Sequence, residues 1–432
     1  MKQWLHEQLY LFYSGILIIH ILNVFIGNTT IDYIVGLLAI PMLIISFIGA
    51  TRLFKILGGL FILTGLIMFF SANLSLYQIP IFLTSNMSLL AFLAVLPWIN
   101  SAVHVGRFDQ RINELLKENV DHLGTFYGRS ILTTYTLMTF LNLSAVTLAQ
   151  DVLVKNMKHV KKRIRDSFII RTTVRAFCRA LIWSPMEVMV AITVDYTGVS
   201  YLVYLPWLLL ISVIGLSLDI LWGRKSFKSI PYQSAVQNKR PVVFKKVFKE
   251  IFKLFIALVL FLTTIVVVSH VFSLNFILAV TLVIIPFSTI WALLMKRWYY
   301  FRVFGWRIWK ERTNHMQNFV VLFISLSIFS NSLNETPFLA LIQRPFSAFD
   351  AYPIVILFFI LITYLMLAMV GVHPIATIGV LNEVLKPMYA IINPVSIGIV
   401  LIVAAMATSS AATYGVTVTM TSMNTGQNPY RI

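Results

Sequence analysis

A polar stretch interrupts a long apolar region near the end of the chain. Residues Gly371-Val372-His373-Pro374-Ile375-Ala376-Thr377 lie between the apolar arms 354–370 and 378–385. A helix needs about 20 apolar residues to cross a bilayer. Unpaired backbone groups are stable at membrane depth only where protein or a water-filled cavity surrounds them. We therefore predict a re-entrant hairpin over 352–387, with this stretch at its tip.

The composition indicates a polytopic membrane protein. Of the 432 residues, 59% are hydrophobic and 12% are charged, whereas soluble proteins contain about 25% charged residues. The single Cys178 excludes a disulfide framework and a cysteine-based metal site. The net charge of +18 fits enrichment of Lys and Arg in cytoplasmic loops better than nucleic-acid binding. We expect no nucleic-acid partner.

The distribution of Lys and Arg predicts the topology. Apolar spans are expected at 9–26, 33–49, 54–71 and 79–99, and basic residues follow the second and fourth spans but not the first and third. Because basic loops are cytoplasmic, both chain termini should lie inside. Low Ala and Gly with abundant Ile, Lys and Phe are compatible with a bacterial plasma membrane.

A second polar stretch lies in the first half of the chain. Residues 141–147 interrupt the apolar segment 131–154, and basic segments flank it on both sides. If this segment crossed the membrane, one basic flank would lie outside. We predict a first hairpin over 131–154, entering from the opposite side to the hairpin 352–387.

Two further apolar segments carry helix breaks. The segment 168–196 contains Trp183-Ser184-Pro185-Met186-Glu187, and proline inside a helix removes a hydrogen bond and clashes with the preceding turn. The segment 393–421 contains Thr408-Ser409-Ser410-Ala411-Ala412-Thr413. We predict one broken transmembrane helix in each segment.

These features predict an all-α polytopic membrane fold with two inverted repeats. Each repeat has scaffold helices, a re-entrant hairpin and a broken transmembrane helix, an arrangement typical of secondary transporters that bind at the bilayer midplane. In the second repeat the final helix is apparently missing, as expected of a truncated sequence. The predicted divisions are an extra N-terminal helix at 1–32, repeat one at 33–222, a basic cytoplasmic linker at 223–253 and repeat two at 254–432.

The motifs resemble those of the ion transporter superfamily over about 33–432. This superfamily includes divalent anion:sodium symporters, citrate and arsenite permeases and the large permease subunits of tripartite carboxylate transporters. Residues 140–147 resemble its Ser-Asn-Thr-type hairpin tip, and 183–187 with Gly198 and Tyr201 resemble its Ser/Thr-Pro break. The stretches 371–377 and 408–413 occupy the corresponding places in the second repeat. A strict Ser-Asn-Thr triplet occurs in neither tip, and Glu187 replaces a residue that is usually neutral.

The expected substrate and ion site combines these four segments. Helix N-termini, amides and hydroxyls suit oxyanions, and the same oxygens suit Na⁺, for which the candidates are Asn142, Ser144, Thr408 and Ser409. The alternative is that Ser and Thr only pack helices closely or satisfy their own backbone. The candidate residues are Asn142, Ser144, Thr147, Ser184, Pro185, Glu187, Gly371, His373, Pro374, Thr377, Thr408, Ser409, Ser410 and Thr413.

Several ionisable residues have two interpretations. His373 suits proton coupling because histidine titrates near neutral pH, or it is a neutral side chain hydrogen-bonded within the tip. Glu187 and Asp151 are candidates for cation or proton sites because acids inside membranes are costly and usually functional. Asp219 is expected to be solvated near the end of a span. Arg171, Arg175 and Arg179 share one helical face, from which they steer an anion inward or anchor the helix at the lipid headgroups.

The predicted function is secondary active transport of a carboxylate or oxyanion, coupled to Na⁺ or H⁺, and not an enzymatic activity. The alternative is a membrane-embedded flippase or enzyme acting on a lipid-linked anionic intermediate. The expected partners are membrane lipids and a small anionic substrate. A homodimer and a separate binding protein or small membrane subunit remain open alternatives. Na⁺ is the one cofactor candidate.

Overall fold

The computed structural model confirms an all-α polytopic membrane protein. It describes residues 2–107, 120, 122–232, 244–349, 351–369, 371–412 and 415–432. This part of the chain is 83% helical and contains no β-strand. Eight of its helical segments are long and apolar enough to cross a membrane. The number is nine if α14 (Trp298–Asn314) and α15 (Gln317–Asn334), bent by 52°, form one span.

The chain divides into two compact units, which we describe separately. Unit 1 consists of Met1–Ala102, Thr264–Ile356 and Ile378–Ile392, and unit 2 of Val103–Thr263, Leu357–Thr377 and Asn393–Ile432. The helices α5 (Met87–Val105), α12 (Phe244–Val271), α17 (Pro353–Met369) and α18 (Pro374–Leu385) run across the unit boundaries.

Unit 1 is built on close packing between α3 and α15. Its helices are α1 (Lys2–Ile26), α2 (Thr29–Gly49), α3 (Arg52–Ser71), α4 (Gln78–Leu83), α13 (Phe276–Leu294), α14 (Trp298–Asn314), α15 (Gln317–Asn334), α16 (Phe338–Ser347) and the 3₁₀ turn Lys386–Ala390. At Gly65 an added Cβ would lie 3.0 Å from the backbone of Phe329. Such contact between backbones is typical of helix pairs in membranes, where small residues allow close approach.

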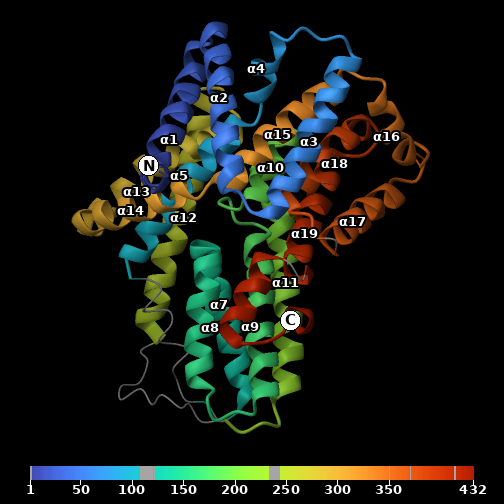
Figure 1. Cartoon of the computed structure of the whole chain (residues 1–432). Coiled ribbons are helices and arrows are strands. Elements are labelled where there is room, and N and C mark those ends of the chain that lie inside the picture. The colour runs from blue at the N-terminus through green and yellow to red at the C-terminus, as the bar shows by residue number, and fades with distance from the viewer. Residues whose placement is uncertain are drawn as a thin grey trace. The chain divides into compact units, whose positions relative to one another are not determined.

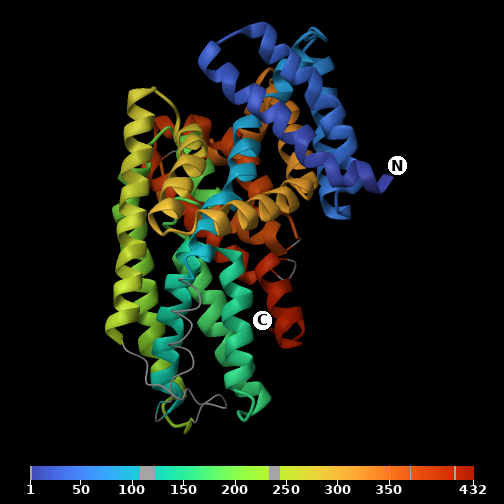
Figure 2. The same ribbon diagram turned by 90° about the vertical axis from the view of Figure 1, so that its left-hand side faces the viewer.

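Unit 2 contains α7 (Leu123–Leu141), α8 (Leu143–Asn156), α9 (Lys162–Leu181), α10 (Val188–Thr197), α11 (Tyr201–Phe227), α19 (Pro394–Ala411), α20 (Val416–Thr425) and a 3₁₀ turn (Pro429–Arg431). Its hydrogen bonds define the helix directions. The Thr134 hydroxyl of α7 donates to the carbonyl of Thr172, and Gln150 of α8 donates to the hydroxyl of the next residue, Thr173. Since Thr134 and Gln150 lie on opposite sides of Asn142, α7 and α8 form an antiparallel hairpin along α9 (Figures 1 and 2).

Two interrupted helices also run antiparallel in unit 2. Helix α9 ends at Leu181 and α10 begins at Val188, while α19 ends at Ala411 and α20 begins at Val416. The Tyr204 hydroxyl lies within hydrogen-bond distance of Thr197, at the end of α10, and of the carbonyl of Pro394, at the start of α19. At the other end, Gln150 contacts both Thr173 of α9 and Thr421 of α20. Along the chain, α9–α10 contacts Gln150 first and Tyr204 second, whereas α19–α20 contacts Tyr204 first and Gln150 second. The two interrupted helices therefore run in opposite directions.

Several helix boundaries differ from those predicted. Helices α7 and α9 begin before the expected residues 131 and 168, and α12 begins at Phe244, inside the expected linker 223–253. The short α16 was not predicted. The apolar pattern marks only the part of a helix suited to lipid. In α9 and α12, turns rich in Lys, Arg and Glu extend the helix beyond that part because these residues have good helix propensity.

The segment predicted as the second hairpin is interrupted at the expected place. Helix α17 ends at Met369 and α18 begins at Pro374. The boundary between the units falls inside α18, after Thr377. The polar stretch 371–377 therefore belongs to unit 2, and most of α18 belongs to unit 1.

The packing of α19 against α11 predicts a strong effect at Gly398. An added Cβ would lie 2.2 Å from the hydroxyl oxygen of Tyr204, whose side chain is fully buried and held by two hydrogen bonds. We expect Gly398→Ala to destabilise the protein by about 1–3 kcal/mol through overpacking. Thermal unfolding in detergent measures this change.

Gly59→Ala is the matched control, since an added Cβ there meets no heavy atom within 4 Å. This variant should keep the melting temperature or raise it, because alanine is the better helix former by roughly 0.5–1 kcal/mol. Equal melting temperatures for the two variants would contradict the close contact between α19 and Tyr204.

Candidate functional site

The tip of the α7–α8 hairpin meets the break between α9 and α10. Asn142 is the single residue between α7 and α8, and its backbone, with φ 50° and ψ −134°, has a conformation that is uncommon for residues other than glycine. Its side-chain amide donates a 3.1 Å hydrogen bond to the carboxylate of Glu187, the residue that precedes α10. The structure thus joins two of the predicted site segments.

The break at 182–187 is supported by side chains from α7 and α11. The carbonyl of Trp183 accepts from the Tyr201 hydroxyl, and the indole N–H of Trp183 donates to the Tyr135 hydroxyl at 2.7 Å. The Ser212 hydroxyl donates to the carbonyl of Arg179 at 2.8 Å. The bonds from Tyr201 and Ser212 satisfy backbone carbonyls near the break, and the bond between Trp183 and Tyr135 ties the break to α7.

The predicted residues Ser184 and Pro185 belong to this structural support. Both are buried, and the Ser184 hydroxyl lies 3.4 Å from the carbonyl of Thr139. Ser184 therefore ties the break to α7.

The second break has a similar hydroxyl support. Thr408, Ser409 and Ser410 each donate to a carbonyl within α19, and the Thr417 hydroxyl donates to the carbonyl of Ser409. In the described side chains no hydrogen bond joins Asn142 to Thr408 or Ser409, two of its expected partners in a Na⁺ site. The predicted residue Thr413 lies outside the described residues.

The other candidate residues of the hairpin all lie on α8. Thr147 is half-buried on α8. Ser144 lies in the first turn of α8, and its side chain is outside the described part. Asp151, also on α8, is exposed.

The stretch 371–377 forms a helix end and a helix start. Gly371 has a φ of 87° and donates its N–H to the carbonyl of Ala368, which ends α17. The Nδ1 atom of His373 accepts from the backbone N–H of Ile375 at 3.2 Å, and Pro374 is the first residue of α18. Proline favours this position because it lacks the N–H that would be unpaired there. The side chain of Thr377 is buried in the first turn, and His373 acts as a cap of α18.

The prediction that Asp219 is solvated is wrong. Asp219 lies on α11 with a side chain only 6% exposed, and its two carboxylate oxygens pair with Arg175 at 2.9 Å and Arg179 at 2.8 Å. Two arginines four residues apart lie on one helical face and can share one acidic partner. That partner lies on another helix, so no pattern in the neighbouring sequence identifies it as Asp219. Pairing with Asp219, rather than headgroup anchoring, is the role of Arg179.

A buried amide cluster was also missed by the sequence analysis. Gln150 is fully buried, and its amide donates to Thr173 at 3.0 Å and to Thr421 at 2.8 Å. Its carbonyl oxygen accepts from Asn424 at 2.9 Å. The only local indication was a glutamine inside an apolar hairpin. The cluster joins α8, α9 and α20.

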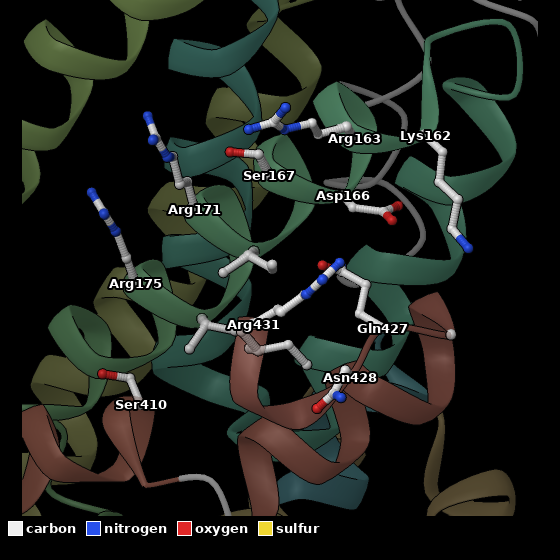
Figure 3. Close-up of a pocket in the computed structure, with 14 residues that line it drawn as sticks. Lys162, Arg163, Asp166, Ser167, Arg171, Arg175, Ser410, Gln427, Asn428 and Arg431 are labelled. Atoms are coloured by element: carbon white, nitrogen blue, oxygen red, sulfur yellow. The ribbon is translucent and has the colours of Figure 1, made fainter.

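A basic pocket lies between α9 and the C-terminal segment that follows α20. Its volume is about 1040 Å³. Figure 3 shows the side chains of Arg163 and Arg171 on one side of α9, and Arg431 extending from the C-terminal segment toward Gln427. Ser410, a predicted site residue, lines the inner part of the same pocket. The cations that line it are Lys162, Arg163, Arg171, Arg175 and Arg431.

Every described candidate residue falls within unit 2. Unit 2 thus contains the α7–α8 tip, both helix breaks, the stretch 371–377 and the basic pocket. No protein-family model and no curated protein matches the chain.

The pairing of Asp219 with two arginines predicts a loss of stability on its removal. Asp219→Asn would keep the shape of the side chain but leave Arg175 and Arg179 without their charged acceptor. We expect a destabilisation of about 1–3 kcal/mol, the range for a buried polar group that loses its partner. Thermal unfolding in detergent is the measurement, and Asp151→Asn, at an exposed carboxylate on α8, is the control. An Asp219→Asn protein as stable as the control would contradict a structural role for the pair.

Proposed function

We propose that the protein is a secondary active transporter of an anionic carboxylate or oxyanion solute, coupled to Na⁺ or H⁺. The observation that carries this proposal is the contact between Asn142 and Glu187, which brings a hairpin tip to a helix break. An acidic side chain within a membrane protein is costly and is usually functional. In this proposal Glu187 and Asn142 bind the coupling cation.

Helix N-termini supply the complementary groups for the anion. New helices begin after each interruption of unit 2, at Leu143, Val188, Pro374 and Val416. The first N–H groups of a helix have no intrahelical acceptor, and the helix dipole favours an anion at this end. The proposed transport site is therefore formed by these helix starts together with the polar residues of the two breaks.

The α7–α8 hairpin is proposed to be re-entrant. Helix α8 has 14 residues, so its length is about 21 Å at 1.5 Å per residue. The hydrocarbon core of a bilayer is about 30 Å thick, which exceeds that length. A hairpin that enters and leaves on one side requires no full crossing.

The two inverted repeats, 33–222 and 254–432, belong to the same proposal. The antiparallel course of α9–α10 and α19–α20 supports them, since repeats of opposite orientation place corresponding broken helices in opposite directions. The bacterial plasma membrane and the cytoplasmic position of both termini remain predictions from charge distribution.

The transport proposal is tested by uptake into proteoliposomes. A panel of carboxylates and oxyanions is first screened by thermal stability, because a ligand that binds only the native state stabilises it. Uptake of the best anion is then driven by a Na⁺ gradient or by a pH gradient. We expect one gradient to drive uptake, and Glu187→Gln and Asn142→Ala each to reduce gradient-driven uptake at least about tenfold, the effect of losing about 1.4 kcal/mol.

Thr136→Ala is the matched control, because the Thr136 hydroxyl donates only to the carbonyl of Leu132 within α7. It should leave uptake unchanged. Equal uptake by wild type, Glu187→Gln and Asn142→Ala would refute the proposed cation site. Stabilisation by polyprenyl phosphate alone, without uptake of any soluble anion, would favour the flippase or lipid-enzyme alternative.

The cap at His373 makes a separate prediction about proton coupling. Asparagine also caps helices through a side-chain acceptor, so His373→Asn should retain the melting temperature and gradient-driven uptake. His373→Ala removes the acceptor of the Ile375 N–H and should cost about 1 kcal/mol of stability. A folded His373→Asn protein that no longer uses a pH gradient would instead identify His373 as the coupling group.

A further inference from the structure

The basic pocket between α9 and the C-terminal segment has an excess of positive charge. Five cations line it, and Asp166 is its acidic residue. Asp166 already pairs with Arg165 at 3.1 Å. Arg175 shares Asp219 with Arg179. We propose that this pocket binds the phosphate group of an anionic phospholipid.

Three arginines carry the charge argument. Among the residues that the structure describes, Arg163, Arg171 and Arg431 have no acidic partner within ion-pair distance. Arg171 contacts the Phe227 ring instead, with its guanidinium carbon 5.8 Å from the ring centroid. Cations held close together repel one another, and a bound anion relieves this repulsion. Guanidinium groups also match phosphate oxygens with two parallel hydrogen bonds.

The position of the pocket favours a lipid over a soluble anion. Phe227 is the last residue of α11, and α11 is long and apolar enough to cross a membrane. The contact between Arg171 and Phe227 therefore places the pocket at the level where this span ends. Ile170, Val174 and Ile432 line the same pocket, so it offers apolar surface beside the cations. Basic pockets between helices at the membrane surface typically bind anionic headgroups.

The C-terminal segment is held in a shape that presents Arg431. Gly426, with a φ of 67°, ends α20. The Ser422 hydroxyl donates to the carbonyl of Gln427 at 2.6 Å, and the side-chain oxygen of Asn428 accepts from the N–H of Tyr430 at 2.9 Å. Arg431 extends from this turn across the pocket (Figure 3). Hydrogen bonds within the chain hold this turn, so less ordering is required when phosphate binds.

The test measures ligand binding by the purified full chain in a neutral detergent. The ligands are phosphatidylglycerol, phosphatidylcholine, glycerol 1-phosphate and inorganic phosphate, and the readouts are lipid adducts in native mass spectrometry and the melting temperature. We expect phosphatidylglycerol to bind and stabilise the protein, and phosphatidylcholine not to. The double variant Arg171→Gln/Arg431→Gln should bind phosphatidylglycerol at least about tenfold more weakly, since each basic residue near a membrane surface contributes about 1 kcal/mol.

Two controls separate the pocket from general surface charge and from folding defects. Lys225→Gln removes an exposed cation from the last turn of α11, outside the pocket, and should leave binding unchanged. Arg171→Lys/Arg431→Lys keeps both charges and should bind better than the glutamine double variant. The ligand-free melting temperature of each variant reports folding.

Three outcomes would overturn the lipid proposal. The first is equal binding of phosphatidylglycerol and phosphatidylcholine. The second is a loss of binding in Lys225→Gln as large as in the double variant. The third is stabilisation by glycerol 1-phosphate or inorganic phosphate that matches phosphatidylglycerol and is lost in the double variant, which would assign the pocket to a soluble phosphate. None of these measurements depends on transport, so the proposed function is tested separately.

Discussion

Unit 2 depends on satisfying backbone groups where its helices are broken. A helix that stops inside a membrane protein leaves carbonyl and N–H groups without partners, and each costs free energy unless another polar group replaces the lost bond. At the first break, the Tyr201 and Ser212 hydroxyls donate to backbone carbonyls and so replace lost bonds. At the second break, the Thr417 hydroxyl does the same. The breaks are thus accommodated by side chains packed around them. The breaks place helix starts inside the protein, where the low dielectric constant strengthens the electrostatic interaction between a helix dipole and a charged group.

The fold was predictable to the extent that it follows from local pattern. Lengths of apolar runs indicated the spans, and Pro185 and Gly371 indicated where helices stop, because their backbone restrictions act within one turn. Contacts between distant helices were not predictable in this way. Nothing near Asp219 in the sequence indicates Arg175 and Arg179. Asn142 and Glu187 were expected in one site from the arrangement of the four interrupted segments, but no local pattern indicated the hydrogen bond between them. The capping role of His373 was one of two interpretations, and geometry was needed to favour it.

The cations of α9 have different roles although they recur on one helix. Arg179 and Arg175 share Asp219, which compensates one of their two positive charges within the protein. Arg171 and Arg163 lie nearer the start of α9 and line the basic pocket. The basic residues of α9 therefore fall into two groups. Arg175 and Arg179 pair with the buried carboxylate of Asp219, whereas Arg163 and Arg171 line the pocket, where a ligand can reach them. Positive charge at the end of a span has a general role in orientation, and here it also forms a concave site.

The proposed transport site and the basic pocket of unit 2 are connected through the C-terminal half of the unit. Ser410 lines the basic pocket and also lies beside Cys178, within a turn of the break that ends at Glu187. From the same region, α20 contacts Gln150 of the hairpin through Thr421 and Asn424. A phosphate bound between Arg171 and Arg431 would link α9 to the segment that follows α20. Because α20 also contacts the hairpin through Gln150, such a ligand would stabilise the position of both interrupted helices relative to the Asn142 tip. The lipid would then be a structural partner of the proposed transport site.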